Sequence, residues 1–432
     1  MPISSSLMAD DAIRQTIQQL PQGFWDFAAA NTKEWTHGYH SYPAMMIPQV
    51  ARNLIAIIQQ HQPGIHTLLD PFMGSGTSLV EGILAGIHAA GSDLNPLSRL
   101  ITLAKTTAWD PQLLQWHTEK LLDYVNRVQV SEADWPDFDN VEFWFKPVVI
   151  ADLTRLKQGI ERVIPETSRP FFWVAFSNTV RWVSNSRNQE FKLYRLDKDH
   201  LTQWNPDVLA TFRRVVERNQ IGNARLWERQ PLPSVELYAH NAMDLSVLPA
   251  ETFDLMLTSP PYGDSHTTVA YGQFSRLSLQ WLNLADAADG PAPHKLDQAM
   301  LGGKSSKELQ HALPSPTLTT ALNKITDQDK RRAREVLSFY QDLDTTLQEI
   351  ARVMRPGSYQ CWVVGNRTVK KVQLLTDRII TELSERYGVI PVVSFTRVIP
   401  NKRMPKENSP TNQIGDKVAT MNGEQIFILR KQ

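Results

Sequence analysis

The segment Asp70-Pro-Phe-Met-Gly-Ser-Gly-Thr77 places a carboxylate, two glycines and two hydroxyls directly after a short apolar run. Glycines at 74 and 76 carry no side chain, so the backbone there can pass close to a ligand. Asp93 ends the next apolar run, 23 positions after Asp70, where an acid can accept hydrogen bonds from ribose hydroxyls. These residue types at this spacing predict a site for a nucleoside.

Two other glycine-rich sites do not fit this segment. A phosphate-binding P-loop needs a lysine before the Ser or Thr that opens its helix, but Gly76 is followed by Thr77 and Ser78. The dinucleotide pattern G-x-G-x-x-G fails at its third glycine, where Leu79 stands. A turn with a purely structural role remains as an alternative.

A second segment with groups suited to chemistry follows the apolar run 253–258. That run predicts a buried strand, and it continues into Ser259-Pro260-Pro261-Tyr262, called the acceptor corner below. Two prolines remove two N–H donors and leave carbonyl oxygens as acceptors. The exocyclic amino group of a base is a weak nucleophile, because its lone pair is delocalised into the ring. Hydrogen bonds to the Pro260 carbonyl and the Ser259 hydroxyl would localise that pair for attack on a sulfonium methyl. Tyr262 could stack on a base taken out of the duplex.

Both segments resemble those of the amino-methyltransferases of DNA. The cofactor motif of that family, D-P-F-x-G-S-G-T, occurs at 70–77, and its acceptor motif, (D/N/S)-P-P-(Y/F/W), occurs at 259–262. Residues 40–44 are similar to the family's N-terminal motif over the methionine end of the cofactor, and 93–96 are similar to its ribose-binding turn. In the motif that contacts adenine, Asn241 stands where the family usually has aspartate, and Asp244 is the second candidate.

The resemblance implies S-adenosylmethionine as the cofactor. The residues that it implies for cofactor binding are Tyr42, Pro43, Asp70, Phe72, Gly74, Ser75, Gly76, Thr77, Asp93, Leu94, Asn241 and Asp244. The residues that it implies for catalysis are Ser259, Pro260, Pro261 and Tyr262.

The first residue of the acceptor motif separates subgroups of this family. Asp or Asn is usual in enzymes that methylate adenine N6, whereas Ser is usual for cytosine N4, so Ser259 favours cytosine and leaves adenine as the alternative. An RNA methyltransferase and a nucleic-acid-binding module without activity are two further alternatives. The single cysteine, Cys361, excludes the cytosine-C5 enzymes, because these need a Pro-Cys nucleophile, and it is expected to be a core residue.

These motifs need a sheet to position them. The runs 66–70 and 87–92 predict two strands joined by a helix with a glycine-rich first turn. In that helix, Ser78 and Glu81 have the form of a capping box, and Gly86 can end it.

The C-terminal part supplies further elements of the sheet. An apolar period of 3.6 residues predicts a helix over 336–354 that leads to a strand at 359–364. A final strand at 425–430 is expected beside 389–395. With these, the resemblance implies an α/β, Rossmann-like fold with a seven-stranded methyltransferase sheet and an antiparallel last strand.

Two stretches do not belong to this common core. We expect residues 35–110 and 236–430 to form the methyltransferase catalytic domain, and 111–235 to be an inserted, largely helical subdomain that recognises the DNA target. Residues 283–335 are a second, polar insertion that could contact DNA.

Basic residues are concentrated in segments. Residues 181–230 hold ten Lys or Arg against six Asp or Glu. The contacts predicted with double-stranded DNA are Arg181, Arg187, Lys192 and Arg195. The run Arg397, Lys402, Arg403 and Lys406 contains no acid and also suits phosphate contacts. A solvated helix face is the alternative explanation for such runs.

The composition sets the remaining limits. The chain has 432 residues, 42% of them hydrophobic, with 45 basic and 45 acidic side chains. No signal peptide or membrane span is recognisable, so we expect a cytoplasmic protein. A single cysteine excludes a thiolate-rich zinc site, and we expect no metal. A cognate restriction endonuclease would be a partner outside this chain.

Overall fold

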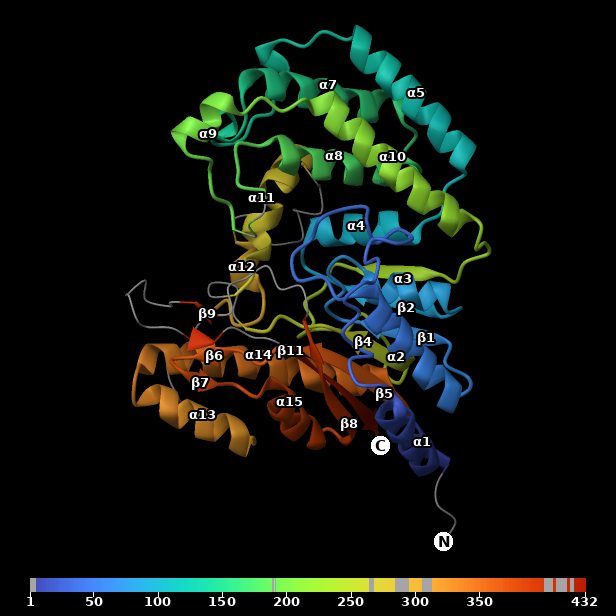
Figure 1. Ribbon diagram of the computed structural model, residues 1–432, viewed down its shortest axis with the longest axis vertical. Coiled ribbons are helices and arrows are strands. Elements are labelled where there is room, and N and C mark those ends of the chain that lie inside the picture. Colours follow the sequence, from blue (N-terminus) through green and yellow to red (C-terminus); the bar gives the residue numbers. More distant parts are fainter. Residues whose placement is uncertain are drawn as a thin grey trace.

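The computed structural model describes residues 5–188, 190, 192–263, 268–283, 295–304, 313–399, 407–408, 418–419 and 423–432. Its main sheet consists of β1 (Thr67–Asp70), β2 (His88–Ser92), β3 (Val235–Tyr238), β4 (Phe253–Thr258), β5 (Met354–Val364), β8 (Val389–Val398) and β11 (Gly423–Lys431). The order across the sheet is β3-β2-β1-β4-β5-β11-β8 (Figure 1). The first five strands in this order are parallel, and β11 is antiparallel to both of its neighbours. The predicted seven-stranded sheet with an antiparallel last strand is confirmed.

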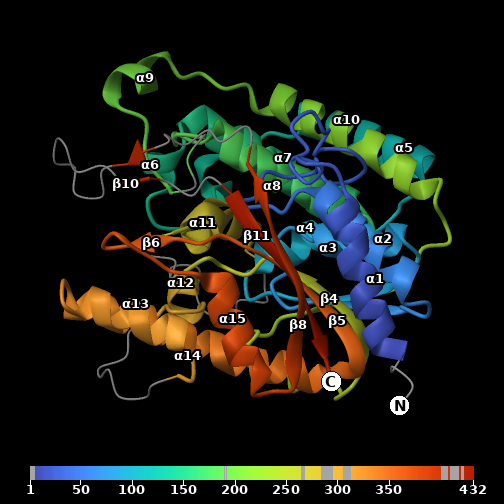
Figure 2. The ribbon, with the colours of Figure 1, turned by 60° about the horizontal axis from the view of Figure 1, so that its bottom comes forward.

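Helices cover both faces of this sheet. On one face lie α1 (Ser5–Gln19), α2 (Pro48–His61) and α3 (Thr77–Leu84); on the other lie α13 (Pro316–Thr326), α14 (Lys330–Val353) and α15 (Thr376–Glu385) (Figure 2). Residues of β4 enter two cores, with Leu255 and Leu257 facing α1–α3 and Met256 facing α13–α15; Phe253, before a shift in register, also faces α13–α15. Burial on both faces explains why this strand is almost continuously apolar in the sequence.

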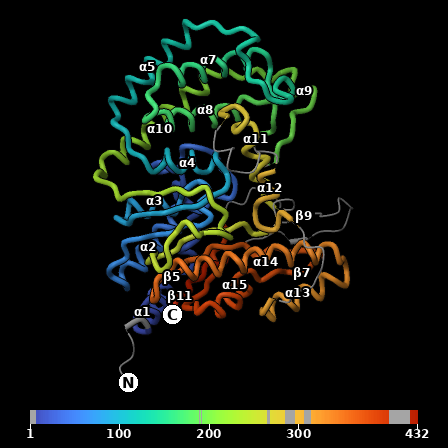
Figure 3. Tube along the Cα trace, turned by 180° about the vertical axis from the view of Figure 1, so that it is seen from behind, coloured from blue at the N-terminus to red at the C-terminus, as the bar shows by residue number. Residues whose placement is uncertain are grey.

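A helical subdomain lies between α4 (Pro96–Thr106) and β3. It consists of α5 (Pro111–Arg127), a 3-10 turn (Glu132–Asp134), α6 (Val141–Trp144), α7 (Pro147–Val163), α8 (Arg169–Val183), α9 (Lys198–Gln203) and α10 (Val208–Trp227). Phe171, Phe172 and Phe176 are fully buried in its core, together with Trp281 of α11 (Tyr271–Leu282). The subdomain occupies one end of the molecule (Figure 3). The predicted helical insertion is therefore present, and α11 joins it to the acceptor segment.

Five shorter elements complete the described chain. They are the helix α12 (Leu296–Ala299), the hairpin of β6 (Thr368–Val369) with β7 (Val372–Gln373), and the pair of β9 (Glu407–Asn408) with β10 (Val418–Ala419).

The sequence predicted the ends of several elements well, but one local motif was wrong. The strand expected at 253–258 is β4, and Gly86 follows α3 with a left-handed φ of 82°. The helix begins two residues earlier than a capping box of Ser78 and Glu81 requires, with Gly76 as its N-cap. Ser78 and Glu81 therefore lie inside α3, where Glu81 serves a different purpose described below.

Candidate active site

A pocket that opens to solvent lies at the carboxyl ends of β1, β2 and β4. Open α/β sheets bind ligands at this edge. Twelve of the sixteen residues predicted for cofactor binding and catalysis line the pocket: Tyr42, Pro43, Asp70, Phe72, Gly74, Ser75, Thr77, Asp93, Leu94, Asn241, Ser259 and Pro261.

The other four predicted residues, Gly76, Asp244, Pro260 and Tyr262, lie next to the pocket but do not line it. Asp244 is exposed, and its carboxylate accepts a hydrogen bond from the backbone N–H two residues later, at 3.1 Å. In the pocket wall, the structure therefore places Asn241 rather than Asp244. Pro260 is buried and Tyr262 is half-buried, both at the acceptor corner.

Sequence reasoning missed several side chains of the pocket. They include Met45, Met46, His240, Tyr271, Met300 and Leu301. The two methionines at 45 and 46 directly follow the predicted N-terminal motif, so their position could have been inferred. Met300 and Leu301 come from the second insertion, and only the fold brings them to the cofactor segment.

The glycine-rich turn adopts backbone angles that favour glycine. Gly74 and Gly76 have φ values of 48° and 74°. A Cβ on Gly76 would lie 2.6 Å from Cγ2 of Thr102, so α4 leaves no space for a side chain there. The N–H of Gly74 donates to Oδ2 of Asp93 at 3.1 Å, which ties the turn to the end of β2. The two motif segments thus form one rigid wall of the pocket.

Asp93 is fixed by several further donors. Its Oδ1 accepts from the N–H of Asn95 at 2.8 Å, and its Oδ2 accepts from the hydroxyl of Ser98 at 2.8 Å. Burial raises the pKa of Asp93, while these hydrogen bonds oppose that shift. The carboxylate is therefore held in one orientation at the predicted ribose contact.

Asp70 connects the cofactor segment to the acceptor strand. Its Oδ1 accepts from the hydroxyl of Thr258 at 2.6 Å and from the N–H of Phe72 at 3.1 Å. Burial raises the pKa of Asp70 to about 6, and the hydrogen bond from Thr258 counteracts part of this shift. Because Thr258 immediately precedes Ser259, the two predicted sites share one hydrogen-bonded junction.

The N-terminal segment that carries Tyr42 is held against the helical subdomain. Nε2 of His40 lies 2.9 Å from the hydroxyl of Ser177 on α8, and Nη2 of Arg218 on α10 donates to the carbonyl of Tyr39 at 2.7 Å. Burial lowers the pKa of His40 to about 3, so this ring is neutral near pH 7. One wall of the pocket thus depends on the inserted subdomain.

The acceptor corner contains a chain of polar contacts. The Ser259 hydroxyl lies 3.3 Å from the Tyr262 hydroxyl, which donates to Oε1 of Glu424 at 2.9 Å. Glu424, at the start of β11, also forms an ion pair with Arg397 of β8. Burial raises the pKa of Tyr262 well above its usual value, so its hydroxyl stays protonated. The last two strands of the sheet therefore hold the tyrosine of the acceptor motif in place.

Comparisons with known proteins agree with this geometry. The Type II methyltransferase M.MvaI of Kocuria varians is 47% identical over 424 residues, which cover 94% of this chain and 93% of that protein. The chain belongs to the type II DNA methyltransferases. The Type II methyltransferase M.BsoBI of Geobacillus stearothermophilus is 21% identical over 426 residues, with 85% of this chain and 81% of that protein covered. The reaction of this methyltransferase is site-specific methyl transfer to DNA.

Two other comparisons give no further support for the function. No family model matches the chain. Among solved structures, the rRNA methyltransferase aviRa of Streptomyces viridochromogenes aligns over 91% of this chain and 88% of its own, with a TM-score of 0.33 and 12% identity.

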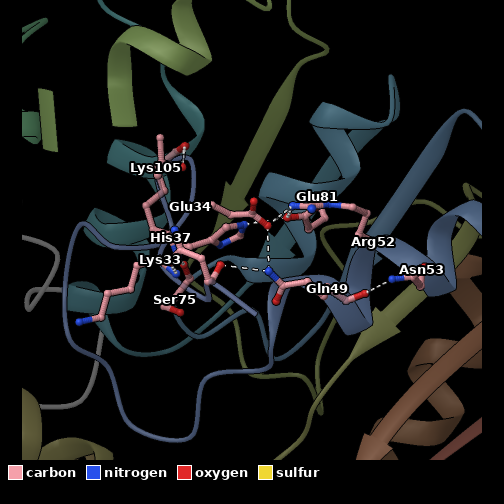
Figure 4. Close-up of polar contacts among 11 residues, drawn as sticks. Lys33, Glu34, His37, Gln49, Arg52, Asn53, Ser75, Glu81 and Lys105 are labelled. Atoms are coloured by element: carbon pink, nitrogen blue, oxygen red, sulfur yellow. Dashed lines mark hydrogen bonds and ion pairs between the residues drawn. The ribbon is translucent and has the colours of Figure 1, made fainter. Parts of the chain in front are cut away.

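A largely buried ionic cluster lies next to the glycine-rich turn of this methyltransferase (Figure 4). Glu81 of α3 accepts from Nε2 of His37 at 2.8 Å and forms two hydrogen bonds of 2.9 Å with Arg52 of α2. Lys105 of α4 is 1% exposed, and its Nζ donates to the carbonyl of Ser75 at 2.6 Å. The cluster thus attaches the N-terminal segment and the glycine-rich turn to three helices.

Lys105 gives a testable pH dependence of stability. Burial lowers the pKa of Lys105 to about 7, whereas an unfolded lysine titrates near pH 10.4, as is roughly usual for this side chain. Between these values the unfolded chain binds more protons, so the free energy of unfolding should rise with pH, by about 1 kcal/mol for each unit above pH 7. Denaturant unfolding between pH 7 and 9 should show a smaller slope in Lys105→Met than in the unaltered protein. The exposed Lys120→Met is the control, and equal slopes in Lys105→Met and the unaltered protein would refute the assignment.

The structure separates the four predicted DNA contacts. Arg187 and Arg195 are exposed and Lys192 is half-buried, close to an isolated bridge between residues 186 and 195. Arg181, in contrast, is only 7% exposed, because its guanidinium lies 4.0 Å from the ring centre of Phe274 and donates to a backbone carbonyl. As placed here, Arg181 is a packing residue of α8 and not a surface contact for DNA.

The basic run near the C-terminus is also only partly described. Arg397 is 3% exposed and is paired with Glu424, so its prediction as a phosphate contact is wrong. Lys402, Arg403 and Lys406 lie outside the described residues. The same applies to 284–294 and 305–312 of the second insertion.

Two absences concern the described residues alone. No group of three or more His, Cys, Asp or Glu side chains could hold a metal ion there. No helix in the described part of the chain has the length and apolar character needed to cross a membrane.

Proposed function

We propose that this methyltransferase transfers the methyl group of S-adenosylmethionine to the exocyclic N4 amino group of cytosine in double-stranded DNA. One observation carries the proposal: the Ser259 corner and the glycine-rich turn border the same pocket. A methyl donor in that pocket would face an amino group held at Ser259. The serine supports cytosine through the resemblance of 259–262 to the acceptor motif of that subgroup.

The residues present suit S-adenosylmethionine. Gly74 opens the backbone to a ligand, and Asp93 is oriented to accept hydrogen bonds from ribose hydroxyls. Asp70 would face the positively charged methionine end, and Asn241 would face the adenine. The apolar side chains of Phe72 and its neighbours would pack against the ring system. When bound, the cofactor supplies an electrophilic methyl group on a sulfonium.

The chain's own groups would prepare the target amine. The Ser259 hydroxyl and the Pro260 carbonyl accept its two hydrogen bonds and draw the nitrogen toward tetrahedral geometry. Pro261 fixes the backbone that presents these acceptors. The ring of Tyr262 provides a surface for the base after it leaves the helix, and its hydrogen bond to Glu424 sets the orientation of that surface.

The helical subdomain is the proposed target-recognition element. Arg187, Lys192 and Arg195 follow α8 within one short segment of the chain. The guanidinium of Arg195 lies 4.0 Å from the ring centre of Phe143. Basic and aromatic side chains together suit phosphate contacts and stacking. We place the enzyme in the cytoplasm, in a restriction-modification system with a cognate endonuclease.

Nucleoside analysis tests the proposal. DNA that lacks modified bases is incubated with the protein and S-adenosylmethionine, digested, and examined by mass spectrometry. The expected product is N4-methylcytosine. N6-methyladenine would overturn the assignment from Ser259 while leaving the reaction class intact, and the absence of any methylated base would overturn the enzyme proposal.

A further inference from the structure

The hairpin of β6 and β7 presents two lysines on a strained backbone. Lys370 and Lys371 form its two-residue tip, with φ values of 48° and 62°. Turns with two left-handed residues usually contain Asn-Gly or Gly-Gly, since each ordinary side chain costs roughly 1–2 kcal/mol there. Both lysines are exposed, so packing of their side chains does not explain the choice. Retained strain at an exposed, charged tip points to a functional role.

The rest of the protein holds this hairpin firmly. Val369 is 5% exposed and packs in the core formed by α13–α15, and Val372 is packed against the same core. The N–H of Leu374 donates to the carbonyl of Arg367 at 2.8 Å, which closes the base of the hairpin. The tip is therefore presented from a rigid support.

The same hairpin begins at the acceptor corner. A Cβ on Gly263, the residue after Tyr262, would lie 2.0 Å from Nη1 of Arg367. The guanidinium of Arg367 therefore lies directly against the backbone of Gly263. From Arg367 to Lys370, three residues of extended chain span roughly 10 Å. The tip of the hairpin thus lies three residues along the chain from a side chain that contacts the acceptor segment.

The tip is paired with the start of α14, where Asp329 lies 3.0 Å from Nζ of Lys370. The next two residues, Lys330 and Arg331, are exposed and basic, and Arg331 pairs with Glu335 at 3.3 Å. A phosphate would compete with Asp329 for Lys370.

We propose that Lys370 and Lys371, at the tip of the hairpin, bind phosphates of the DNA strand that carries the target base. This inference rests on the proposed function and adds a second contact surface. The helical subdomain would read the target from one side, while the hairpin fixes the backbone beside the acceptor corner. Contacts with phosphate are independent of sequence and release counterions, so they leave a signature in the salt dependence of binding.

The test is DNA affinity as a function of salt, measured by fluorescence anisotropy with a short duplex of arbitrary sequence. Lys370→Ala/Lys371→Ala should bind on the order of tenfold more weakly than the unaltered protein, with a log–log salt slope smaller by about two units. Affinity for S-adenosylmethionine should not change. Lys370→Arg/Lys371→Arg keeps both charges and should restore the slope.

The matched control is Lys120→Ala/Arg127→Ala on α5, which removes the same charge far from the hairpin (Figure 1). Asp329→Asn keeps a capping side chain but removes the acid that competes for Lys370, and should strengthen DNA binding. An unaltered slope in the Lys370/Lys371 alanine variant, or an equal loss in the α5 control, would overturn the hairpin proposal alone. Failure of the unaltered protein to bind any duplex and to transfer methyl groups would instead overturn the proposed function.

Discussion

Replacing Ser259 with alanine is expected to lower the rate of methyl transfer about 100-fold, which is typical for the loss of one transition-state hydrogen bond. The variant keeps the Pro260 carbonyl but loses the hydroxyl that would help to localise the lone pair of the target amine. Affinity for S-adenosylmethionine should hardly change, because the glycine-rich turn and Asp93 remain intact. Single-turnover kinetics with labelled cofactor measures the rate, and calorimetric titration measures the affinity.

Tyr262→Phe is the matched variant for this experiment. It keeps the ring that would stack on the target base but removes the hydroxyl that lies 3.3 Å from Ser259 and donates to Glu424. DNA affinity should therefore be nearly normal, with a smaller loss of rate than in Ser259→Ala. If Ser259→Ala transferred methyl groups at the normal rate, or lost cofactor affinity as strongly as rate, Ser259 would not be the acceptor for the amine.

The sequence predicted those parts of the site that depend on local chain geometry. Asp70 and Asp93, both predicted to bind the cofactor, line one pocket because parallel strands end at one edge of a sheet, so the residues at the ends of β1 and β2 meet there. The strand before the acceptor motif was also predicted from the sequence, because burial on both faces makes it almost continuously apolar. For such segments, a residue's neighbours in the chain already determine its surroundings.

Contacts between distant segments could not be predicted in this way. Glu424 lies 162 positions after Tyr262, and only the antiparallel insertion of β11 between β5 and β8 brings the two side chains together. A basic residue type also does not reveal burial: Arg397 and Arg181 appeared to be surface charges but are covered by Glu424 and Phe274, respectively.

The capping-box prediction shows a conflict between local and tertiary demands. Ser78 and Glu81 have the right spacing, yet Gly76 takes the N-cap position, with a left-handed φ of 74° and no space for a side chain next to Thr102. Glu81 is consequently available for the buried cluster with His37 and Arg52.

Gly74→Asp should weaken binding of S-adenosylmethionine by at least about 100-fold, since the side chain would fill ligand space and add a third carboxylate to a wall that already holds two. Gly74 lines the pocket, a Cβ there would lie 3.5 Å from Cε1 of Tyr42, and the new carboxylate would join Asp70 and Asp93. Asp is among the residues that tolerate a left-handed φ, so the fold should persist. Gly74→Asn has the same shape without the charge and separates the two effects.

Gly86→Asp provides the control at the other end of α3. Gly86 has a left-handed φ of 82°, and nothing lies within 4 Å of a Cβ built there, so this variant carries the same backbone strain in open space. Thermal unfolding should show similar small losses in Gly74→Asp and Gly86→Asp, whereas calorimetric titration should show lost cofactor affinity in the first variant alone. Unchanged affinity in Gly74→Asp would mean that the backbone at this turn does not approach the cofactor. Equal losses of affinity in both variants would mean that strain in α3, rather than contact with the ligand, explains the effect.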